Sequence, residues 1–212
     1  MAIANNGPHG SHRGRIGNIV YYMLNGQPVS RQIGFTDKPP TVGQLTTRLS
    51  TKICSEFLAS VKEFTQIGFA AEAEGTTANP FNVAVKYNRK YIIKGTYPDL
   101  AIDFEKVVLS AGSLKQPENW QVTETADGLQ YTWEADPQMP WSESTDQVMM
   151  LAYFPLKGKV IYTLFGNNRL SGSDVLEIPS SLRGTSMETY MSFVAADRKQ
   201  TANSIYTGSF NQ

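Results

Sequence analysis

The chain has 212 residues, of which 41% are hydrophobic and 18% charged, a globular composition long enough for one large domain or two small ones. Equal numbers of basic and acidic residues, 19 of each, exclude a global field that would draw the protein to nucleic acid or anionic lipid. The single cysteine, Cys54, excludes an internal disulfide, and no apolar run is long enough to span a membrane. The first ten residues lack the charged and apolar regions of a secretory signal, which predicts a protein made in the cytoplasm.

Residues 1–35 form a distinct segment in which glycines alternate with basic and aromatic side chains. Asn25-Gly26 lies between two stretches of strand composition, residues 16–23 and 29–33. Asn-Gly favours a β-hairpin because both central residues of a type I′ turn need positive φ. The pattern therefore predicts a basic, flexible arm that contains one hairpin.

Residues 36–100 are predicted to hold a helical segment and a connector. After the stiff Lys38-Pro39-Pro40, Thr41 is a plausible N-cap, and Gly68 is the natural end of the helix. Apolar residues recur between them at helical steps of three and four: Leu45, Leu49, Ile53, Phe57, Val61 and Phe64, with Cys54 packed in the same stripe. A second helix over 79–91, capped by Asn79, competes with a strand, because apolar residues also alternate there.

Residues 101–212 change to the period of two that is typical of β-strands. About seven or eight short strands are expected at the spacing of a β-sandwich. The first is expected over residues 102–108, and an Asp127-Gly128 turn is expected between the next two, which carry Trp120 and Val122 and then Leu129, Tyr131 and Trp133. The later strands are expected over 147–154, 160–165, 174–178, 190–195 and 204–210. The predicted fold class is mostly β, α+β overall, with a hairpin arm and an amphipathic helix ahead of an immunoglobulin-like β-sandwich.

The order of these signals resembles the fibronectin type III arrangement over about 110 residues. Trp133 stands on an early strand, Leu182 precedes a late one, and Tyr190 lies on that late strand. The resemblance implies that these three side chains pack together between the two sheets. It carries no implication for function.

Few residues have the pattern of a catalytic or metal site. His9 and His12 lack further Cys or His ligands, and a glycine-rich tail cannot hold them as a catalytic base, so no metal, cofactor or catalytic residue is predicted. Asp136, Glu143 and Asp146 surround Trp141, which suggests either a sugar-stacking loop or a polar connection with Trp141 folded over the sandwich end.

The arm offers a candidate interaction surface. Its arginines and tyrosines could contact nucleic acid through phosphate pairing and base stacking, but three arginines in a neutral protein favour protein assembly instead. An arm with strand-forming segments can add to the sheet edge of a neighbour. The candidate interaction residues are Arg13, Arg15, Tyr21, Tyr22, Arg31 and Trp141.

Motifs along nearly the whole chain are similar to an uncharacterised protein family found in Bacteroidota and some of their phages. They are Gly14-Arg-Ile-Gly17-Asn-Ile-Val-Tyr21-Tyr22, Gly26 and Arg31, Gln44 with Arg48, Ile67-Gly68-Phe69, Gly95 with Tyr97-Pro98, Ser110 with Gly112 and Leu114, and Ser204 with Tyr206 and Gly208. The resemblance implies no activity, but it allows a virion setting.

These observations predict a non-enzymatic structural or assembly protein, a homo-oligomer plausibly belonging to a phage particle, which docks on neighbouring subunits through its N-terminal arm. The alternative is a module that binds carbohydrate or a cell surface through Trp141.

Overall fold

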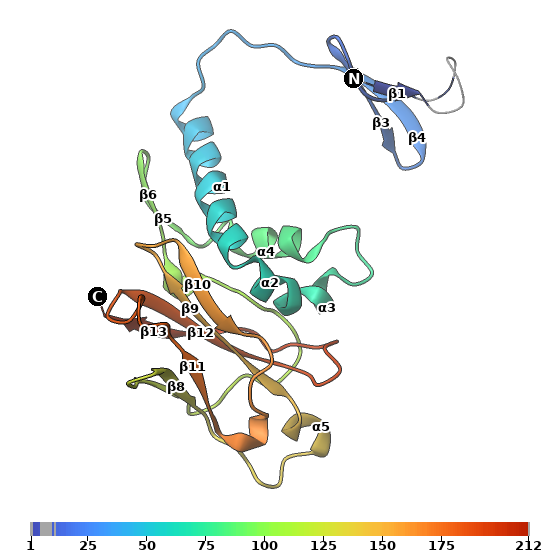
Figure 1. Ribbon diagram of the computed structural model, residues 1–212. Coiled ribbons are helices and arrows are strands. Elements are labelled where there is room, and N and C mark those ends of the chain that lie inside the picture. Colours follow the sequence, from blue (N-terminus) through green and yellow to red (C-terminus); the bar gives the residue numbers. More distant parts are fainter. Residues whose placement is uncertain (1, 5–9, 11, 212) are drawn as a thin grey trace. The chain divides into compact units, whose positions relative to one another are not determined.

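The computed structural model describes residues 2–4, 10 and 12–211, and the chain divides into two compact units, Met1–Thr41 and Val42–Gln212 (Figure 1). The first unit is an antiparallel sheet in the order β1-β2-β3-β4. Its strands are β1 (Ala2–Ala4), β2 (His12–Ile16), β3 (Ile19–Leu24) and β4 (Gln27–Gln32). Asn25 and Gly26, with φ of 51° and 81°, join β3 to β4, which confirms the predicted hairpin.

The second unit begins with helices. They are α1 (Val42–Ser60), α2 (Lys62–Gly68), α3 (Ala70–Ala73) and α4 (Pro80–Asn88), followed by the hairpin β5 (Ile93–Thr96) and β6 (Asp99–Ile102) and by η1 (Phe104–Lys106). The start of the long helix after Thr41 is confirmed. The Asn79 side chain accepts a hydrogen bond of 2.8 Å from the backbone N–H of Asn82, so α4 is the capped helix and the competing strand does not form.

Gly68 is the last residue of α2, as predicted, but the single helix expected over this stretch is divided at Val61 and a further short helix, α3, follows at Ala70. The role of Gly68 is close packing. A Cβ at this position would collide with the backbone oxygen of Leu109 and with Ser110, so only glycine lets α2 approach that segment.

A β-sandwich occupies the remainder of the second unit. Its strands are β7 (Gln121–Glu124), β8 (Gly128–Thr132), β9 (Gln147–Phe154), β10 (Lys159–Thr163), β11 (Ser173–Glu177), β12 (Met187–Val194) and β13 (Ile205–Phe210), with one turn of helix, α5 (Trp141–Ser144), and η2 (Arg169–Ser171) in the connections. One sheet has the order β10-β9-β12-β13 and the other β11-β8-β7, all antiparallel. The predicted fold class, mostly β with a sandwich, is confirmed.

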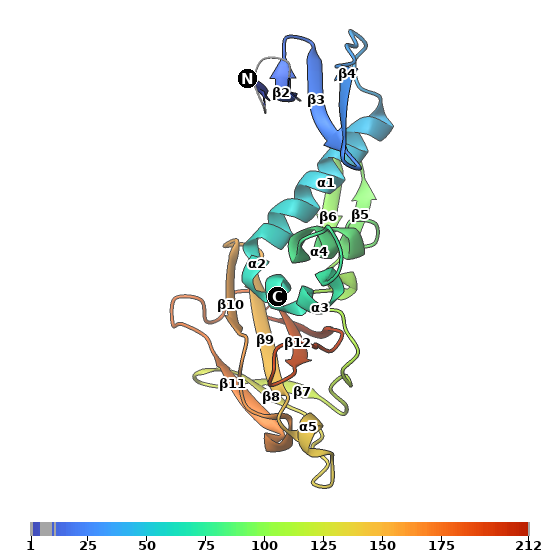
Figure 2. The ribbon, with the colours of Figure 1, turned by 90° about the vertical axis from the view of Figure 1, so that its right-hand side faces the viewer.

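The sheet β10-β9-β12-β13 is covered on both faces (Figure 2). Residues of α1, α2 and α4 form one apolar core with Leu151 and Tyr190 of this sheet. A second core lies between the two sheets and includes Leu129 from β8 and Phe193 from β12. Every residue of β12 is buried as a result.

This layering corrects one implication of the fibronectin resemblance. Trp133 and Leu182 do pack between the sheets, but Tyr190 belongs to the core on the helical side, where its hydroxyl donates a hydrogen bond to the Phe104 carbonyl at 2.8 Å. Met187 lies between the sheets instead. The pairing of β12 with β13 shifts register between Thr189 and Tyr190.

The division expected from the sequence, at residues 1–35, 36–100 and 101–212, stays a prediction. The structure places a boundary after Thr41 and groups all of 42–212 in one compact unit. The physical reason is the core that the helices share with the sandwich sheet.

Candidate interaction site

The register of the N-terminal sheet decides which of the candidate residues share a face. Arg15 of β2 pairs with Val20 of β3, and Val20 pairs with Arg31 of β4. Since successive residues of a strand point to opposite faces, Tyr22 lies on the same face as Val20. Arg13, two residues before Arg15, and its partner Ile3 complete a surface that we call the arginine face: Ile3, Arg13, Arg15, Val20, Tyr22, Leu24, Val29 and Arg31.

The opposite face of this sheet carries no charged side chain among the residues that the structure describes. His12 and Tyr21 lie on it with their ring centroids 5.5 Å apart. We call it the apolar face: His12, Ile16, Ile19, Tyr21 and Met23. The structure thus brings together four of the predicted interaction residues, Arg13, Arg15, Tyr22 and Arg31, and separates Tyr21 from them.

Neither face of the N-terminal sheet is covered. No described residue before Val42 is buried, and the two core clusters contain none of them. Ile16, Ile19 and Met23 of the apolar face are each between 41% and 49% exposed. A sheet of this size ordinarily needs one packed face to be stable in water, and neither face of the N-terminal sheet is packed against a core.

The three arginines of the arginine face differ in how many of their hydrogen-bond donors are already used within the chain. Arg15 donates through Nε to the Gly17 carbonyl at 2.8 Å, so part of its donor set is used within the turn. No hydrogen bond or ion pair is recorded for the side chains of Arg13 and Arg31 in the described part of the chain. A guanidinium presents five donors in a planar fork, which suits a carboxylate or a phosphate.

Trp141, the remaining candidate, lies far along the sequence on α5 and is 83% exposed. The expectation that it folds over the sandwich end is therefore wrong. A shallow depression of about 330 Å³ adjoins it, lined also by Ser144, Thr145, Asn168, Leu170 and Ser171. An exposed indole beside hydroxyl and amide groups offers a ligand an apolar ring together with polar groups.

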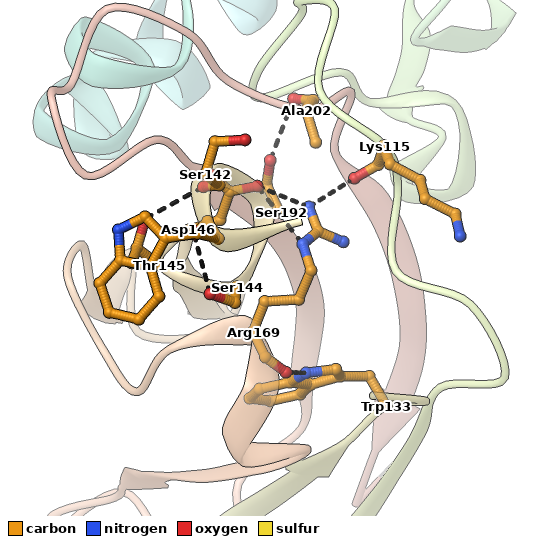
Figure 3. Close-up of polar contacts among 10 residues, drawn as sticks. Lys115, Trp133, Ser142, Ser144, Thr145, Asp146, Arg169, Ser192 and Ala202 are labelled. Atoms are coloured by element: carbon orange, nitrogen blue, oxygen red, sulfur yellow. Dashed lines mark hydrogen bonds and ion pairs between the residues drawn. The ribbon is translucent and has the colours of Figure 1, made fainter. Parts of the chain in front are cut away.

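The carboxylates near Trp141 do not converge on it. Asp146 is buried and pairs with Arg169, with 3.1 Å between Oδ2 and the guanidinium Nη2 (Figure 3). Arg169 also donates to the Lys115 carbonyl at 2.8 Å, and its guanidinium lies 3.8 Å from the centre of the Phe193 ring. Burial raises the pKa of the Asp146 carboxyl, and the Arg169 charge offsets part of that effect.

Sequence reasoning missed this ion pair because its members are 23 residues apart and belong to no motif. The Trp133 indole N–H donates to the Arg169 carbonyl at 2.7 Å, so the pair joins the core to the end of the sandwich (Figure 3). The arrangement fastens the connection before β9 to the connection before β11. Its geometry is that of a structural pair rather than of a reactive carboxylate.

Asp136 and Glu143 line a different pocket, of about 450 Å³, at the same end of the sandwich. Its carboxylates come from Glu118, Glu134, Asp136 and Glu143, and its apolar lining from Pro137, Met139 and Pro140. We call it the carboxylate pocket. The three acidic residues grouped by the sequence are therefore split, with Asp146 withdrawn into the interior.

No group of metal-ligating side chains is found among the residues that the structure describes. His12 lies in β2, and His9 lies outside the described residues. Burial raises the pKa of the Cys54 thiol, which lies on the buried side of α1 within the helical core. No helix in the described part of the chain is long and apolar enough to cross a membrane.

A family of unknown function, DUF6266, matches the chain over residues 11–208. The chain belongs to this family. The DUF6266 match reaches into both units, so strands β2, β3 and β4 of the N-terminal sheet belong to the sequence that the family shares. No curated protein and no solved structure matches the chain.

Proposed function

We propose that this DUF6266 protein is a non-enzymatic assembly protein whose N-terminal sheet docks on neighbouring protein subunits. The observation that carries the proposal is the uncovered sheet of the first unit. Its strands are paired and in register, yet none of its described residues is buried. A second surface is needed to complete it.

The apolar face is the part that gains most from a partner. Fully burying one Ile or Met side chain stabilises by about 1.5 to 3 kcal/mol, and Ile16, Ile19 and Met23 lie together on neighbouring strands. Exposed apolar groups gathered on one surface of a protein mark interaction sites. The second unit needs no such help, since two cores of its own stabilise it.

Deleting residues 1–35 tests this function. Because residues 42–212 form a compact unit, the truncated protein should remain folded and become monomeric, whereas the full chain associates. Sedimentation velocity across a range of concentrations measures the change. If the truncated protein oligomerises as the full chain does, the N-terminal sheet is not the docking element.

A point variant separates the apolar face from the rest of the arm. Ile19→Ser with Met23→Ser keeps every strand and should weaken association at least tenfold. The matched control is Val175→Ser on β11, a residue as exposed as Ile19 but in the second unit, which should leave association unchanged. An equal loss of association in both variants would indicate non-specific hydrophobic association rather than docking through the apolar face.

A virion setting is the finer form of the proposal, and the resemblance to a family shared by Bacteroidota and their phages supports it. Capsid and tail accessory proteins dock on repeated neighbours, which suits a sheet that needs a covering surface. Mass spectrometry of purified particles from a host that encodes the protein should then detect it in stoichiometric amount. If the protein is detected only in the host cell fraction, the virion hypothesis is wrong.

Carbohydrate binding is the second candidate, and the exposure of Trp141 favours it. The indole stands beside Leu170 and the polar groups of Asn168 and Ser171. Binding on a glycan array that disappears in Trp141→Ala supports this function. The control is Trp120→Ala, which removes another partly exposed indole outside the depression.

A further inference from the structure

The two units of the chain have opposite charge. Residues 1–41 carry four basic and one acidic side chain, a net charge of +3. Residues 42–212 carry fifteen basic and eighteen acidic side chains, a net charge of −3. The zero net charge of the whole protein therefore conceals a strong separation, and two copies can attract each other head to tail.

The positive charge is concentrated on one side of the N-terminal sheet. Arg13, Arg15 and Arg31 all belong to the arginine face, and the apolar face has none of them. Adjacent strands lie about 4.8 Å apart, so the three guanidinium groups can reach one small area of a partner. Tyr22 and Val29 stand among them and add apolar contact.

The carboxylate pocket of the second unit has the complementary chemistry. Glu118, Glu134 and Asp136 are exposed on its wall, and Pro137 and Pro140 are exposed beside them. The two basic residues of its lining are already paired: Arg169 with the buried Asp146, and Lys115 with Glu118 at 3.1 Å. Glu134, Asp136 and Glu143 have no basic partner among the described residues.

From this complementarity we propose that the arginine face of one copy docks on the carboxylate pocket of a second copy. The contact is heterologous, because the two surfaces differ, so repeated copies form a ring or a filament rather than a closed dimer of like surfaces. Arginine–carboxylate pairs select the partner, and Tyr22 packs against the prolines of the pocket. The inference rests on the proposed docking of the N-terminal sheet and concerns its second face. It identifies the partner of the arginine face, whereas the apolar face lies on the other side of the sheet and is covered in a separate contact.

Nucleic acid would also attract arginine and tyrosine, but two observations favour protein. The second unit, with its net charge of −3, repels phosphate, and the number of free arginines is small for a polyanion. A second copy supplies carboxylates at a site that already contains apolar residues for Tyr22 to contact.

Two charge-reversed variants of the full chain test the proposal. Arg13→Glu with Arg31→Glu alters the arginine face and leaves Arg15 in its turn. Glu118→Arg with Glu134→Arg alters the carboxylate pocket. The control, Glu74→Arg with Glu177→Arg, makes the same charge change at exposed positions outside that pocket. Thermal unfolding and circular dichroism establish that each variant is folded.

Each charge-reversed variant alone should associate at least tenfold more weakly than the wild type, while the control associates as the wild type does. In a mixture of the two, the pocket variant supplies an intact arginine face and the arginine-face variant supplies an intact pocket. These two intact surfaces can pair, and the two reversed surfaces can pair as well. The mixture should therefore regain association, measured by sedimentation velocity with one variant fluorescently labelled. The wild type should weaken steeply as salt is raised from 50 to about 500 mM.

The outcomes separate this inference from the proposed function. If the wild type is monomeric, or if deletion of residues 1–35 leaves association unchanged, both the proposed docking function and this inference are wrong. If the wild type assembles through its N-terminal sheet but the pocket variant assembles normally, the docking function stands and this inference is overturned. Binding of a DNA or RNA oligonucleotide by the wild type that is lost in Arg13→Glu/Arg31→Glu, with no effect of the pocket variant, also overturns it.

Discussion

The strands β3 and β12 both lie inside antiparallel sheets, but they differ completely in burial. All eight residues of β12 are buried, with helices on one side and the second sheet on the other. None of the six residues of β3 is buried. The comparison shows that regular strand pairing does not by itself complete a structure, since only the second unit has cores that stabilise its sheets.

The largest difference between the two units is expected when one arginine is removed from each and the free energy of unfolding is measured. Arg169→Ala should lower the free energy of unfolding by about 3 to 5 kcal/mol, because Asp146 would keep a buried charge without a partner. Arg31→Ala, on the exposed sheet, should change it by less than about 0.5 kcal/mol. Urea unfolding of the two variants measures both values, and similar losses would mean that the N-terminal sheet shares the stability of the core.

An aliphatic pair sharpens the same contrast. Leu151 on β9 is fully buried, so Leu151→Ala should cost about 2 to 5 kcal/mol through lost burial and the cavity that remains. Ile19→Ala should leave the unfolding of the monomer nearly unchanged and weaken association instead. The measurement is urea unfolding at a concentration where the protein is monomeric. A cost at Ile19 near that at Leu151 would contradict the account.

A local contact of the second unit should have an intermediate effect. Asn79→Ala removes the side-chain cap of α4 and should cost about 1 kcal/mol of unfolding free energy. Asn79→Ser, which retains a capping oxygen, should recover most of this loss. Thermal unfolding of both variants gives the comparison, and equal losses in Ala and Ser would show that the cap is not the cause.

The last expected effect is a pH dependence that arises in the second unit. Burial, aided by a hydrogen bond of 2.6 Å to Glu188, raises the pKa of Tyr206 to about 12. The folded state then holds the phenolic proton more tightly than the unfolded state, so the stabilisation is complete below about pH 10 and is lost as the pH rises towards 12. Burial raises the pKa values of Tyr131 and Tyr190 in the same direction.

Urea midpoints at pH 9 and pH 11 measure this effect. The wild type should lose stability over the interval, and Tyr206→Phe should lose less because one titrating group is gone. The slope with pH is compared, since Tyr206→Phe also removes a hydrogen bond at neutral pH. An equal slope in the variant would show that Tyr206 does not titrate as expected.

Local chemistry explains what the sequence could predict. The Asn25-Gly26 turn and the Asn79 cap depend on residues within four positions of one another, so both are recognisable without tertiary information. The sandwich strands were also predictable, because apolar runs such as residues 147–154 can be satisfied only inside a core. The mostly β class follows from these local signals.

The rest depends on contacts distant in sequence. The position of Tyr190 was predicted wrongly because a strand buried on both faces shows no alternation and β12 has a register shift beside this residue. The arginine face could not be predicted, because the sequence of β2 contains a glycine and two arginines and has no pattern typical of a strand. The pairing of β2 with β3 was therefore not expected. The Asp146–Arg169 pair likewise has no local signal.

Amide hydrogen exchange at two protein concentrations tests most directly whether the first unit depends on a partner. The account predicts that amides of β2, β3 and β4 exchange rapidly in dilute monomer and become protected as the protein associates, while those of β9 and β12 are protected at both concentrations. Equal protection of β3 in monomer and assembly would contradict it, because the N-terminal sheet would then be stable without any covering surface.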